Sequence, residues 1–422
     1  MSNKTTTSPP AATRPAAPAP KRLLWMLGPA LVAGVAYLDP GNVASNMTAG
    51  ARFGYLLVWV VVAANTMAWL IQYLSAKLGL VTGKSLPQLL GERIGRKSAR
   101  RLYWLQAELV AMATDVAEVI GGAVALWLLF DLPLLLGGVI TGVISMAVLG
   151  LQGSGRHRTF EYVIVSMMAI IAVGFTAGVV ISPPDAGELA GGLVPRFEGS
   201  ESVLLAASIL GATVMPHAIY AHSALTRDRF PDRSTILTTP MLIRATRWDV
   251  TIALAVAGTV NLAILLLAAT SLQGVDGTDT LEGAHAAIAA SLGGAVATLF
   301  AVGLLASGLA STSVGAYAGA EIMQGLLKIR IPMLLRRLIT LIPALLILAA
   351  GIDPTWALVL SQVILSFGIP FALIPLVWLT SRKDLMGVYC NRWWTTALGV
   401  VVALLLVGLN ITLLVLTFSG AG

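Results

Sequence analysis

The chain has 422 residues, of which 57% are hydrophobic and only 11% are charged, and its formal net charge is +7. Soluble domains carry about 25% charged residues, so this composition excludes a soluble protein and predicts a helical protein that crosses the membrane many times. The basic residues are scattered over many connections, which argues against a nucleic-acid-binding patch, and a single cysteine, Cys390, allows no internal disulfide or thiolate metal cluster.

The N-terminal residues 1–22 are rich in Thr, Pro, Ala and Ser, which is typical of a disordered tail. The remainder, 23–422, is expected to be a membrane domain, and its first apolar run is too long for a signal peptide. Apolar runs of membrane-spanning length predict eleven spans, at residues 23–50, 56–80, 101–130, 133–151, 160–182, 202–226, 248–269, 292–325, 333–351, 355–380 and 393–417.

The basic residues predict the orientation of these spans. Of the 27 Lys and Arg, all except Arg52 and Arg196 lie in the tail or around the connections that follow the even-numbered spans. Cytoplasmic loops collect Lys and Arg, so the N-terminus is expected inside and the C-terminus outside. Five spans before span 6 and five from it onward predict two repeats of opposite orientation, 23–182 and 202–380. Span 11, 393–417, is then an extra helix.

Span 1 carries the sequence Asp39-Pro40-Gly41-Asn42 about sixteen residues from its start. A carboxylate at that depth lies near the bilayer midplane, where ionised groups are costly and usually functional. Pro40 has no N–H and Gly41 tolerates almost any backbone angle, so the helix is expected to break here. Freed backbone groups are tolerated at this depth only where they line a cavity or an ion. An acid, a break and an amide oxygen together predict an ion site.

Span 3 carries three acids, Glu108, Asp115 and Glu118, within roughly an 80° stripe of one helix. Burial and mutual repulsion make it costly for all three to stay ionised, which predicts that they carry protons. The alternative is a structural stripe paired with arginines, of which Arg336 and Arg337 at the start of span 9 are the nearest. Both interpretations can hold together, with an arginine as the cytoplasmic neighbour of the proton path.

Span 6 carries a second interruption, Met215-Pro216-His217. Interrupted spans at corresponding places in two repeats point to the binding site of a transporter. The thioether of Met215 is a soft donor that favours transition metals over Ca²⁺ and Mg²⁺, although a methionine can also be a flexible core residue. The predicted donors to a divalent cation are Asp39, Asn42, Met215 and the backbone carbonyls around Ala36 and Ala212.

Four further polar side chains lie in apolar spans. His217 and His222 are five residues apart, about 500° around a helix, so they are not expected to hold one ion together. Each histidine either takes part in proton-linked conformational change or forms a hydrogen bond between helices. Asn261 in span 7 and Gln362 in span 10 are expected to form hydrogen bonds between helices.

These motifs together resemble those of the Nramp family of proton-coupled divalent transition-metal transporters, in particular its bacterial manganese and iron importers. The resemblance extends from about Leu24 to the end of the chain. It rests on the motifs of spans 1 and 6, the acids of span 3, Arg336-Arg337 and the run 361–368. It implies an all-α membrane protein with a LeuT-like fold, discontinuous helices 1 and 6, and transport by alternating access.

The resemblance also implies functions for individual residues. Those implied to hold the metal, some only in particular states, are Asp39, Asn42, Met215, Gln362 and the carbonyls of Ala36 and Ala212. Those implied to move protons, or to assist, are Asp39, Asp115, Glu118, Glu108, His217, Arg336 and Arg337. Family members that favour magnesium lack the methionine, so Met215 implies Mn²⁺ and Fe²⁺ as substrates.

A transporter of this kind is no enzyme and needs no cofactor or nucleic acid. It is expected to work as a monomer in a bacterial plasma membrane, with metal ions, protons and lipid as its partners. The nearest alternatives are a Na⁺-coupled amino-acid transporter of the same fold, an integral-membrane metalloenzyme and a channel. The predicted donors do not rank Mn²⁺ against Fe²⁺, Co²⁺, Cd²⁺ or Zn²⁺, since they bind all of these.

Overall fold

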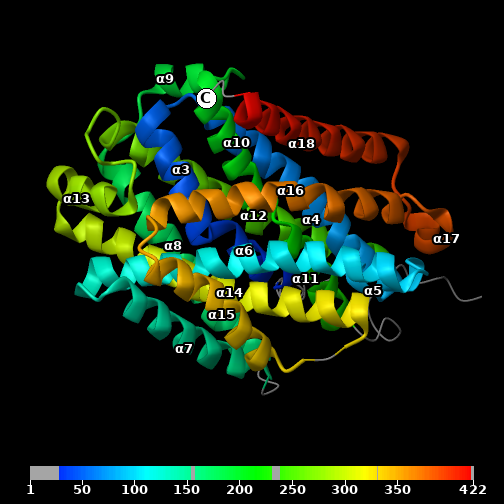
Figure 1. The fold of residues 1–422 in the computed structure, drawn as a ribbon. Helices are drawn as coiled ribbons and strands as arrows, with labels where there is room; N and C mark the ends of the chain where they lie inside the picture. The colour runs from blue at the N-terminus through cyan, green and yellow to red at the C-terminus, as the bar shows by residue number, and fades with distance from the viewer. Residues whose placement is uncertain (1–27, 154–156, 231–237, 330, 420–422) are drawn as a thin grey trace, which may run out of the picture.

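The structure, a computed structural model, describes residues 28–153, 157–230, 238–329 and 331–419. The predicted tail, 1–22, and the first residues of span 1 lie outside these ranges. Within them every regular element is helical and there is no β-strand. In Figure 1 the long helix α6 (Lys97–Phe130) runs between α14 (Gly294–Leu327) and α16 (Pro354–Thr380), and it packs against both.

Span 1 is a broken helix. It consists of α2 (Pro29–Val35), the 3-10 turn η1 (Ala36–Leu38) and α3 (Pro40–Phe53). Asp39 lies between η1 and α3 in an extended conformation, with φ −68° and ψ 163°. Pro40 is the first residue of α3, where its missing N–H costs no hydrogen bond, because the first N–H groups of a helix have no partner within it.

Span 6 is broken in the same way. Its two parts are α10 (Gly199–Thr213) and α11 (Pro216–Arg229), and Val214 and Met215 separate them. Pro216 is the first residue of α11, as Pro40 is of α3. Both breaks therefore place a proline at the start of the second half-helix, and both leave the backbone before that proline outside the regular helix.

The other nine predicted spans each coincide with one helix. Eight helices, with α10 and α11 taken as one, are long and apolar enough to cross a membrane, and two shorter apolar helices lie at 29–38 and 134–148, among the residues that the structure describes. These observations agree with a multi-pass membrane protein, and the count of eleven stays a prediction. The nine helices are α4 (Val58–Thr82), α6, α7 (Leu134–Gly153), α8 (His157–Ile181), α12 (Thr239–Ser271), α14, α15 (Met333–Ala349), α16 and α18 (Trp393–Ser419).

Four helices lie in the connections between the predicted spans, where the sequence predicted no helix. They are too short or too polar to stand out as apolar runs, although one of them has a recognisable start: Ser85 and Gln88 form a capping box. In addition, α12 begins at Thr239, before the predicted start at 248. The four helices are α5 (Leu86–Arg93), α9 (Ala186–Gly192), α13 (Leu281–Leu292) and α17 (Lys383–Met386), the last followed by the 3-10 turn η2 (Gly387–Tyr389).

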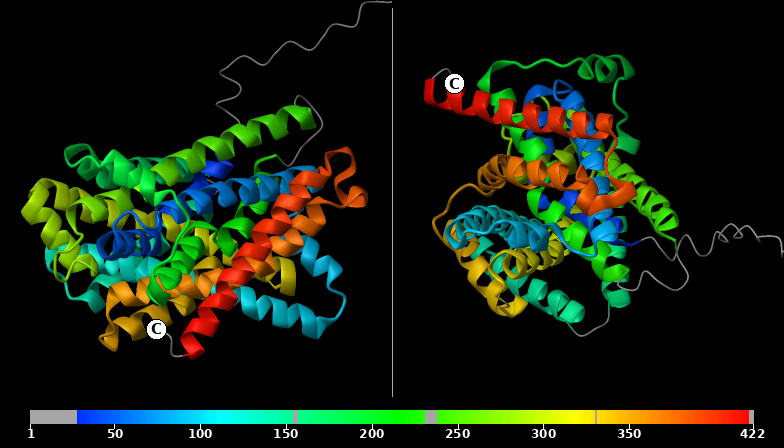
Figure 2. Two further views of the ribbon diagram at one scale, coloured as in Figure 1. Left: turned by 90° about the horizontal axis from the view of Figure 1, so that it is seen from above. Right: turned by 90° about the vertical axis from the view of Figure 1, so that its right-hand side faces the viewer.

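Two glycines bring both broken helices against α16. A Cβ on Gly41 of α3 would overlap the side chain of Gln362, and a Cβ on Gly211 of α10 would overlap the carbonyl oxygen of the same residue. Small residues allow helices in a membrane to approach this closely. The extra helix α18 lies at the edge of the bundle, against α10 and α16 (Figure 2). The breaks of α2–α3 and α10–α11 are therefore held together in the interior.

Candidate functional site

The two helix breaks are in direct contact. Asn42 on α3 donates a hydrogen bond from Nδ2 to the carbonyl of Ala212 on α10, at 2.8 Å. Thr213 donates from its hydroxyl to Asn42 Oδ1 at 3.4 Å. One turn further along, the hydroxyls of Ser45 and Ser208 are 2.6 Å apart. Segments about 170 residues apart in the sequence therefore form one polar site inside an apolar bundle.

The carboxylate of Asp39 is at the centre of this site. Its Oδ1 accepts hydrogen bonds from the backbone N–H and the side chain of Asn42, at 2.8 and 2.9 Å. Its Oδ2 accepts from Gln362 Nε2 at 3.2 Å. Asp39, Asn42 and Gln362 are all fully buried, with 0% exposure. Because Asp39 also caps the N-terminus of α3, the helix dipole favours its negative charge.

The remaining predicted donors lie at the same two breaks. Ala36, Ala212 and Met215 are all fully buried. The carbonyl of Ala36 accepts a hydrogen bond from the N–H of Asp39 at 3.3 Å, and Met215 caps α11 in an extended conformation. The site thus offers a carboxylate, two side-chain amides, backbone carbonyls at the breaks and one thioether. Oxygen donors combined with sulfur suit divalent transition metals.

A metal centre rich in charged ligands is not present elsewhere in the described residues, where no group of three or more His, Cys, Asp and Glu could hold a metal ion. A cation bound at the breaks would therefore meet one carboxylate and several neutral donors. Such a donor set lacks the three or four strong ligands of a catalytic zinc site. This composition suits an ion that must be released again more than one that stays bound.

Side chains from other helices hold the broken backbone of span 1. Asn261 on α12 donates from Nδ2 to the carbonyl of Tyr37 at 2.9 Å. Ser307 on α14 donates from its hydroxyl to the carbonyl of Leu38. These bonds satisfy carbonyls that the break removes from the helical ladder, and an unsatisfied carbonyl in the bilayer interior is costly. Asn261 thus forms a hydrogen bond between helices, and its partner is the break itself.

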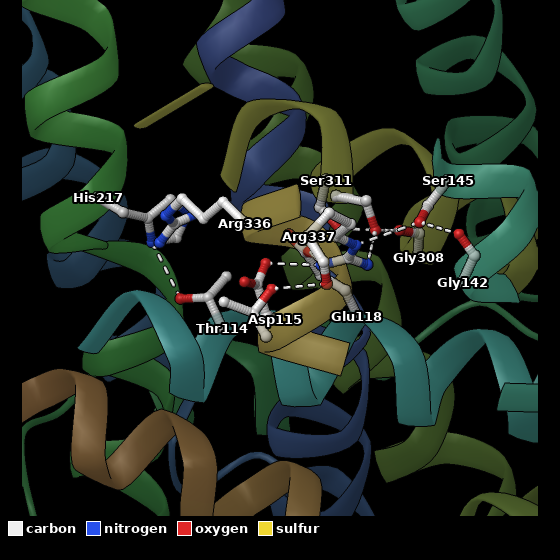
Figure 3. A network of polar contacts seen from close by, with 12 residues as sticks. Thr114, Asp115, Glu118, Gly142, Ser145, His217, Gly308, Ser311, Arg336 and Arg337 are labelled. Carbon is white, nitrogen blue, oxygen red and sulfur yellow. Dashed lines mark hydrogen bonds and ion pairs between the residues drawn. The ribbon is translucent and has the colours of Figure 1, made fainter. Parts of the chain in front are cut away.

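The acids of α6 form ion pairs with both arginines of α15, and Figure 3 shows Asp115 and Glu118 beside Arg337. Arg336 Nη2 lies 2.6 Å from Glu108 Oε1. Arg337 Nη1 lies 2.7 Å from Asp115 Oδ1 and 3.5 Å from Glu118 Oε2. Three carboxyl groups thus share two guanidinium groups. A proton on one carboxyl group would leave this buried cluster neutral, so pairing and proton binding are compatible.

Every nitrogen of the Arg337 guanidinium group has a polar partner. It is 0% exposed. Its Nη2 donates to the hydroxyl of Thr312 on α14 at 3.2 Å, and its Nε donates to the hydroxyl of Ser145 on α7 at 3.2 Å. With the acids on α6, one guanidinium group therefore joins four helices. Burying a charge is favourable only with such complete pairing and hydrogen bonding.

The two histidines of α11 contact different helices. His217 Nδ1 lies 3.1 Å from the hydroxyl of Thr114 on α6, and His222 Nδ1 lies 2.7 Å from Gln72 Oε1 on α4. They therefore do not converge on one ion. His217 follows the break at Met215 by two residues and contacts the residue before Asp115. Figure 3 shows its ring directed at Thr114, on the same helix as Asp115 and Glu118.

Several residues of the site were not singled out from the sequence. Gln72 also donates to the hydroxyl of Tyr37 at the break, and Asp249 on α12 accepts from the backbone N–H groups of Gly28 and Ala30 at the start of α2, at 3.1 and 2.9 Å. Gln72 and Asp249 are polar residues within or at the start of apolar spans, which is the signal that could have identified them. Thr114 carries no such signal, because serine and threonine are common in membrane helices.

Comparison with known proteins gives a consistent result. The family described as "Natural resistance-associated macrophage protein-like", or Nramp, matches residues 30–416. The divalent metal cation transporter MntH of Mycobacterium tuberculosis is 59% identical over 396 residues, which are 94% of this chain and 92% of the relative. MntH of Bacillus subtilis is 47% identical over 399 residues, which are 94% of this chain and 93% of the relative.

A solved structure has a similar fold. It is that of the Eremococcus coleocola manganese transporter in complex with an aromatic bis-isothiourea substituted compound. The TM-score is 0.83 and the sequence identity is 31%, over 94% of this chain and 88% of that chain. The likeness therefore extends over nearly the whole membrane domain.

Proposed function

Because this chain belongs to the Nramp family, we propose that it imports Mn²⁺, Fe²⁺ and similar divalent cations, coupled to protons, by alternating access. It is a metal transporter and not an enzyme, and the divalent metal is its substrate and not a cofactor. The observation that carries the proposal is the contact of the two breaks, in which Asn42 joins Asp39 to the carbonyl of Ala212. Relatives that are divalent metal transporters disfavour the alternative of a Na⁺-coupled amino-acid transporter.

The proposed metal site lies between the breaks. A divalent cation there would replace the two hydrogen bonds that Asn42 Nδ2 donates to Asp39 and Ala212, with the amide turned so that its oxygen faces the ion. Asp39 supplies the negative charge and Met215 the soft donor. Gln362, and the carbonyls of Ala36 and Ala212, complete the coordination in particular conformations. Full burial of these groups fits a substrate held away from both aqueous sides.

The proposed proton path starts at the same carboxylate. Asp39 exchanges its proton when the metal binds, and His217, two residues from Met215, lies between the metal site and α6. Protons then move along the stripe of acids on α6 toward its start. Arg336 and Arg337 tune these acids and compensate their charge. The acids of the path after Asp39 are Asp115, Glu118 and Glu108.

We propose a LeuT-like architecture of eleven membrane-spanning helices for this function. The two repeats are 23–182 and 202–380, with 393–417 as an extra helix, and the two broken helices are the first of each repeat. The scatter of basic residues supports a cytoplasmic N-terminus and an external C-terminus in a bacterial plasma membrane. A polar site enclosed by one chain supports a monomer as the working unit.

Uptake in proteoliposomes tests the proposed function. Mn²⁺ is expected to enter liposomes that contain the protein, faster when the outside is more acidic than the inside, and to carry protons inward in the absence of an imposed gradient. A fluorescent metal indicator and a pH-sensitive dye inside the liposomes measure both. If Mn²⁺ entered at a rate independent of the pH gradient and without proton entry, proton coupling would be contradicted. Metal transport itself would still be supported.

The selectivity of the site is expected to depend on Met215. Met215→Ala removes the only sulfur among the proposed donors and leaves all the oxygens. Mn²⁺ uptake is expected to persist in part, while the preference for Mn²⁺ over Ca²⁺ falls by about tenfold, equivalent to ~1.4 kcal/mol. Competition of Ca²⁺ with Mn²⁺ uptake measures this ratio, and Met47→Ala, a buried methionine on α3, is the control. An unchanged ratio would mean that the thioether of Met215 does not contribute to the selectivity of the site.

Proton coupling is expected to depend on Asp115. Asp115→Asn keeps the shape of the side chain and removes its proton-binding site, while Glu118 remains beside Arg337. Metal uptake is expected to continue, and the metal-driven entry of protons to be lost. The pH dye detects this loss. Glu92→Gln, an acid-to-amide change at an exposed ion pair with Lys84, is the control, and wild-type coupling in Asp115→Asn would refute the path.

A further inference from the structure

A groove of about 300 Å³ opens between α6, α14 and α15. These three helices pack together in the part of the fold shown at the lower centre of Figure 1. The groove is lined mainly by apolar side chains, and several of them face outward from the bundle: Leu105 is 46% exposed, Leu109 55% and Ile339 52%. In a membrane protein such a face is covered by lipid. The other apolar lining residues are Trp104, Met112, Met323 and Ile331.

A buried arginine also lines this groove. Arg336 is only 4% exposed, and its Nη2 group is bound to Glu108. Its Nε–H group is buried and has no hydrogen-bond partner within the described chain. An unsatisfied donor at the edge of the hydrocarbon region is costly. A molecule in the groove that carries an acceptor oxygen would remove this cost.

Two basic side chains precede the groove residues on the same face of α6. With 3.6 residues per turn, Lys97 and Arg101 share a face with Leu105 and Glu108, one to three turns before them. Both are exposed, and neither pairs with an acid among the residues that the structure describes. The acid that most closely precedes them in the sequence, Glu92 on α5, pairs with Lys84 at 2.8 Å. The positive charge at the start of α6 is therefore uncompensated.

We propose that this groove binds an anionic phospholipid. The phosphate group lies between Lys97 and Arg101, and an ester oxygen accepts the hydrogen bond that Arg336 Nε lacks. An acyl chain runs along Leu105 and Leu109 into the apolar part of the groove. Basic pockets between membrane helices on the cytoplasmic side recognise such headgroups. The apolar wall distinguishes a lipid from free phosphate. This proposal rests on the proposed orientation of the chain in the membrane, and it does not depend on proton-coupled metal transport.

Lipid titration tests the proposal. The purified protein in detergent is titrated with phosphatidylglycerol and with phosphatidylcholine, and bound lipids are counted by native mass spectrometry. One phosphatidylglycerol molecule is expected to bind more tightly than phosphatidylcholine. The double variant Lys97→Gln/Arg101→Gln is expected to bind it about thirtyfold more weakly, because each basic residue near the membrane surface contributes roughly fivefold. Lys383→Gln/Arg392→Gln removes the same charge elsewhere on the cytoplasmic side and is expected to bind as the wild type does.

Two further experiments test the acyl-chain groove and distinguish a lipid from free phosphate. Leu109→Trp narrows the groove without a change in charge and is expected to weaken phosphatidylglycerol binding as well. Inorganic phosphate is expected not to displace the lipid. Equal affinity in the Lys97/Arg101 variant and the wild type, equal loss in both double variants, or displacement by inorganic phosphate would each overturn the proposal. Mn²⁺ uptake in phosphatidylcholine liposomes, expected to be unchanged in Lys97→Gln/Arg101→Gln, reports on transport separately.

Discussion

Arg337→Met is expected to lower the free energy of unfolding by about 3–5 kcal/mol, the cost of leaving a buried charge without its partner. The substitution keeps an unbranched apolar stem and removes the guanidinium group that contacts Asp115 and Glu118. It also removes the hydrogen bonds to Thr312 and Ser145. Thermal unfolding in detergent, followed by the fluorescence of the tryptophans, measures the loss.

Two further variants test whether the loss of stability comes from the buried ion pairs of Arg337. Arg382→Met removes an arginine that pairs with Asp384 on the surface, where solvent screens an ion pair so that it contributes little to stability. Its unfolding temperature is therefore expected to stay close to that of the wild type. Arg337→Met combined with Asp115→Asn is expected to be more stable than Arg337→Met alone, because one uncompensated carboxylate has been removed as well. If Arg337→Met and Arg382→Met unfold at the same temperature, the cluster does not stabilise the fold.

Asp39→Asn is expected to abolish metal uptake. The amide has the shape of the carboxylate, and its oxygen can still accept the hydrogen bond from the backbone N–H of Asn42, so the break is expected to keep its geometry. The substitution removes the only negative charge among the proposed donors. Loss of one partner from a buried charge pair costs about 2–5 kcal/mol, or roughly 30-fold to several thousandfold in affinity. Mn²⁺ uptake in proteoliposomes measures the change.

The matched control for Asp39→Asn is Asp276→Asn, the same change at an exposed residue in the connection between α12 and α13. Its uptake is expected to equal that of the wild type. The unfolding temperature of Asp39→Asn is expected to stay near the wild-type value, which separates loss of binding from loss of fold. Substantial Mn²⁺ uptake by folded Asp39→Asn would mean that the cation is held elsewhere.

The breaks and the charge cluster could be anticipated because their causes are local. Pro40 and Pro216 cannot continue a helix, and each begins the second half-helix in the structure. Buried acids at helical spacing need partners, and Arg336 and Arg337, the pair expected from the sequence, are the arginines that contact them. The sequence did not determine which arginine serves which acid. Arg337 pairs with Asp115 and Glu118 because α15 packs along α6. This packing also places the guanidinium group of Arg337 against Thr312 and Ser145.

Contacts across the fold could not be anticipated in this way. Asn261 was expected to form a hydrogen bond between helices, but its partner, the carbonyl of Tyr37, is free only because span 1 is broken there. Gln362 reaches Asp39 because Gly41 and Gly211 allow α3 and α10 to approach α16. Each of these contacts depends on the packing of three or more elements. The short helices α5, α9, α13 and α17 were not predicted for another reason, because apolar periodicity is weak in short segments.

The position of a bound cation tests the central claim most directly. Crystals of the protein grown with Mn²⁺, measured with X-rays near the manganese absorption edge, give an anomalous difference map that locates the metal without reference to the protein. The expected result is a peak between the breaks of α2–α3 and α10–α11, in contact with Asp39 and Met215. A strong peak elsewhere in the membrane domain, with none between the two broken helices, would contradict this account.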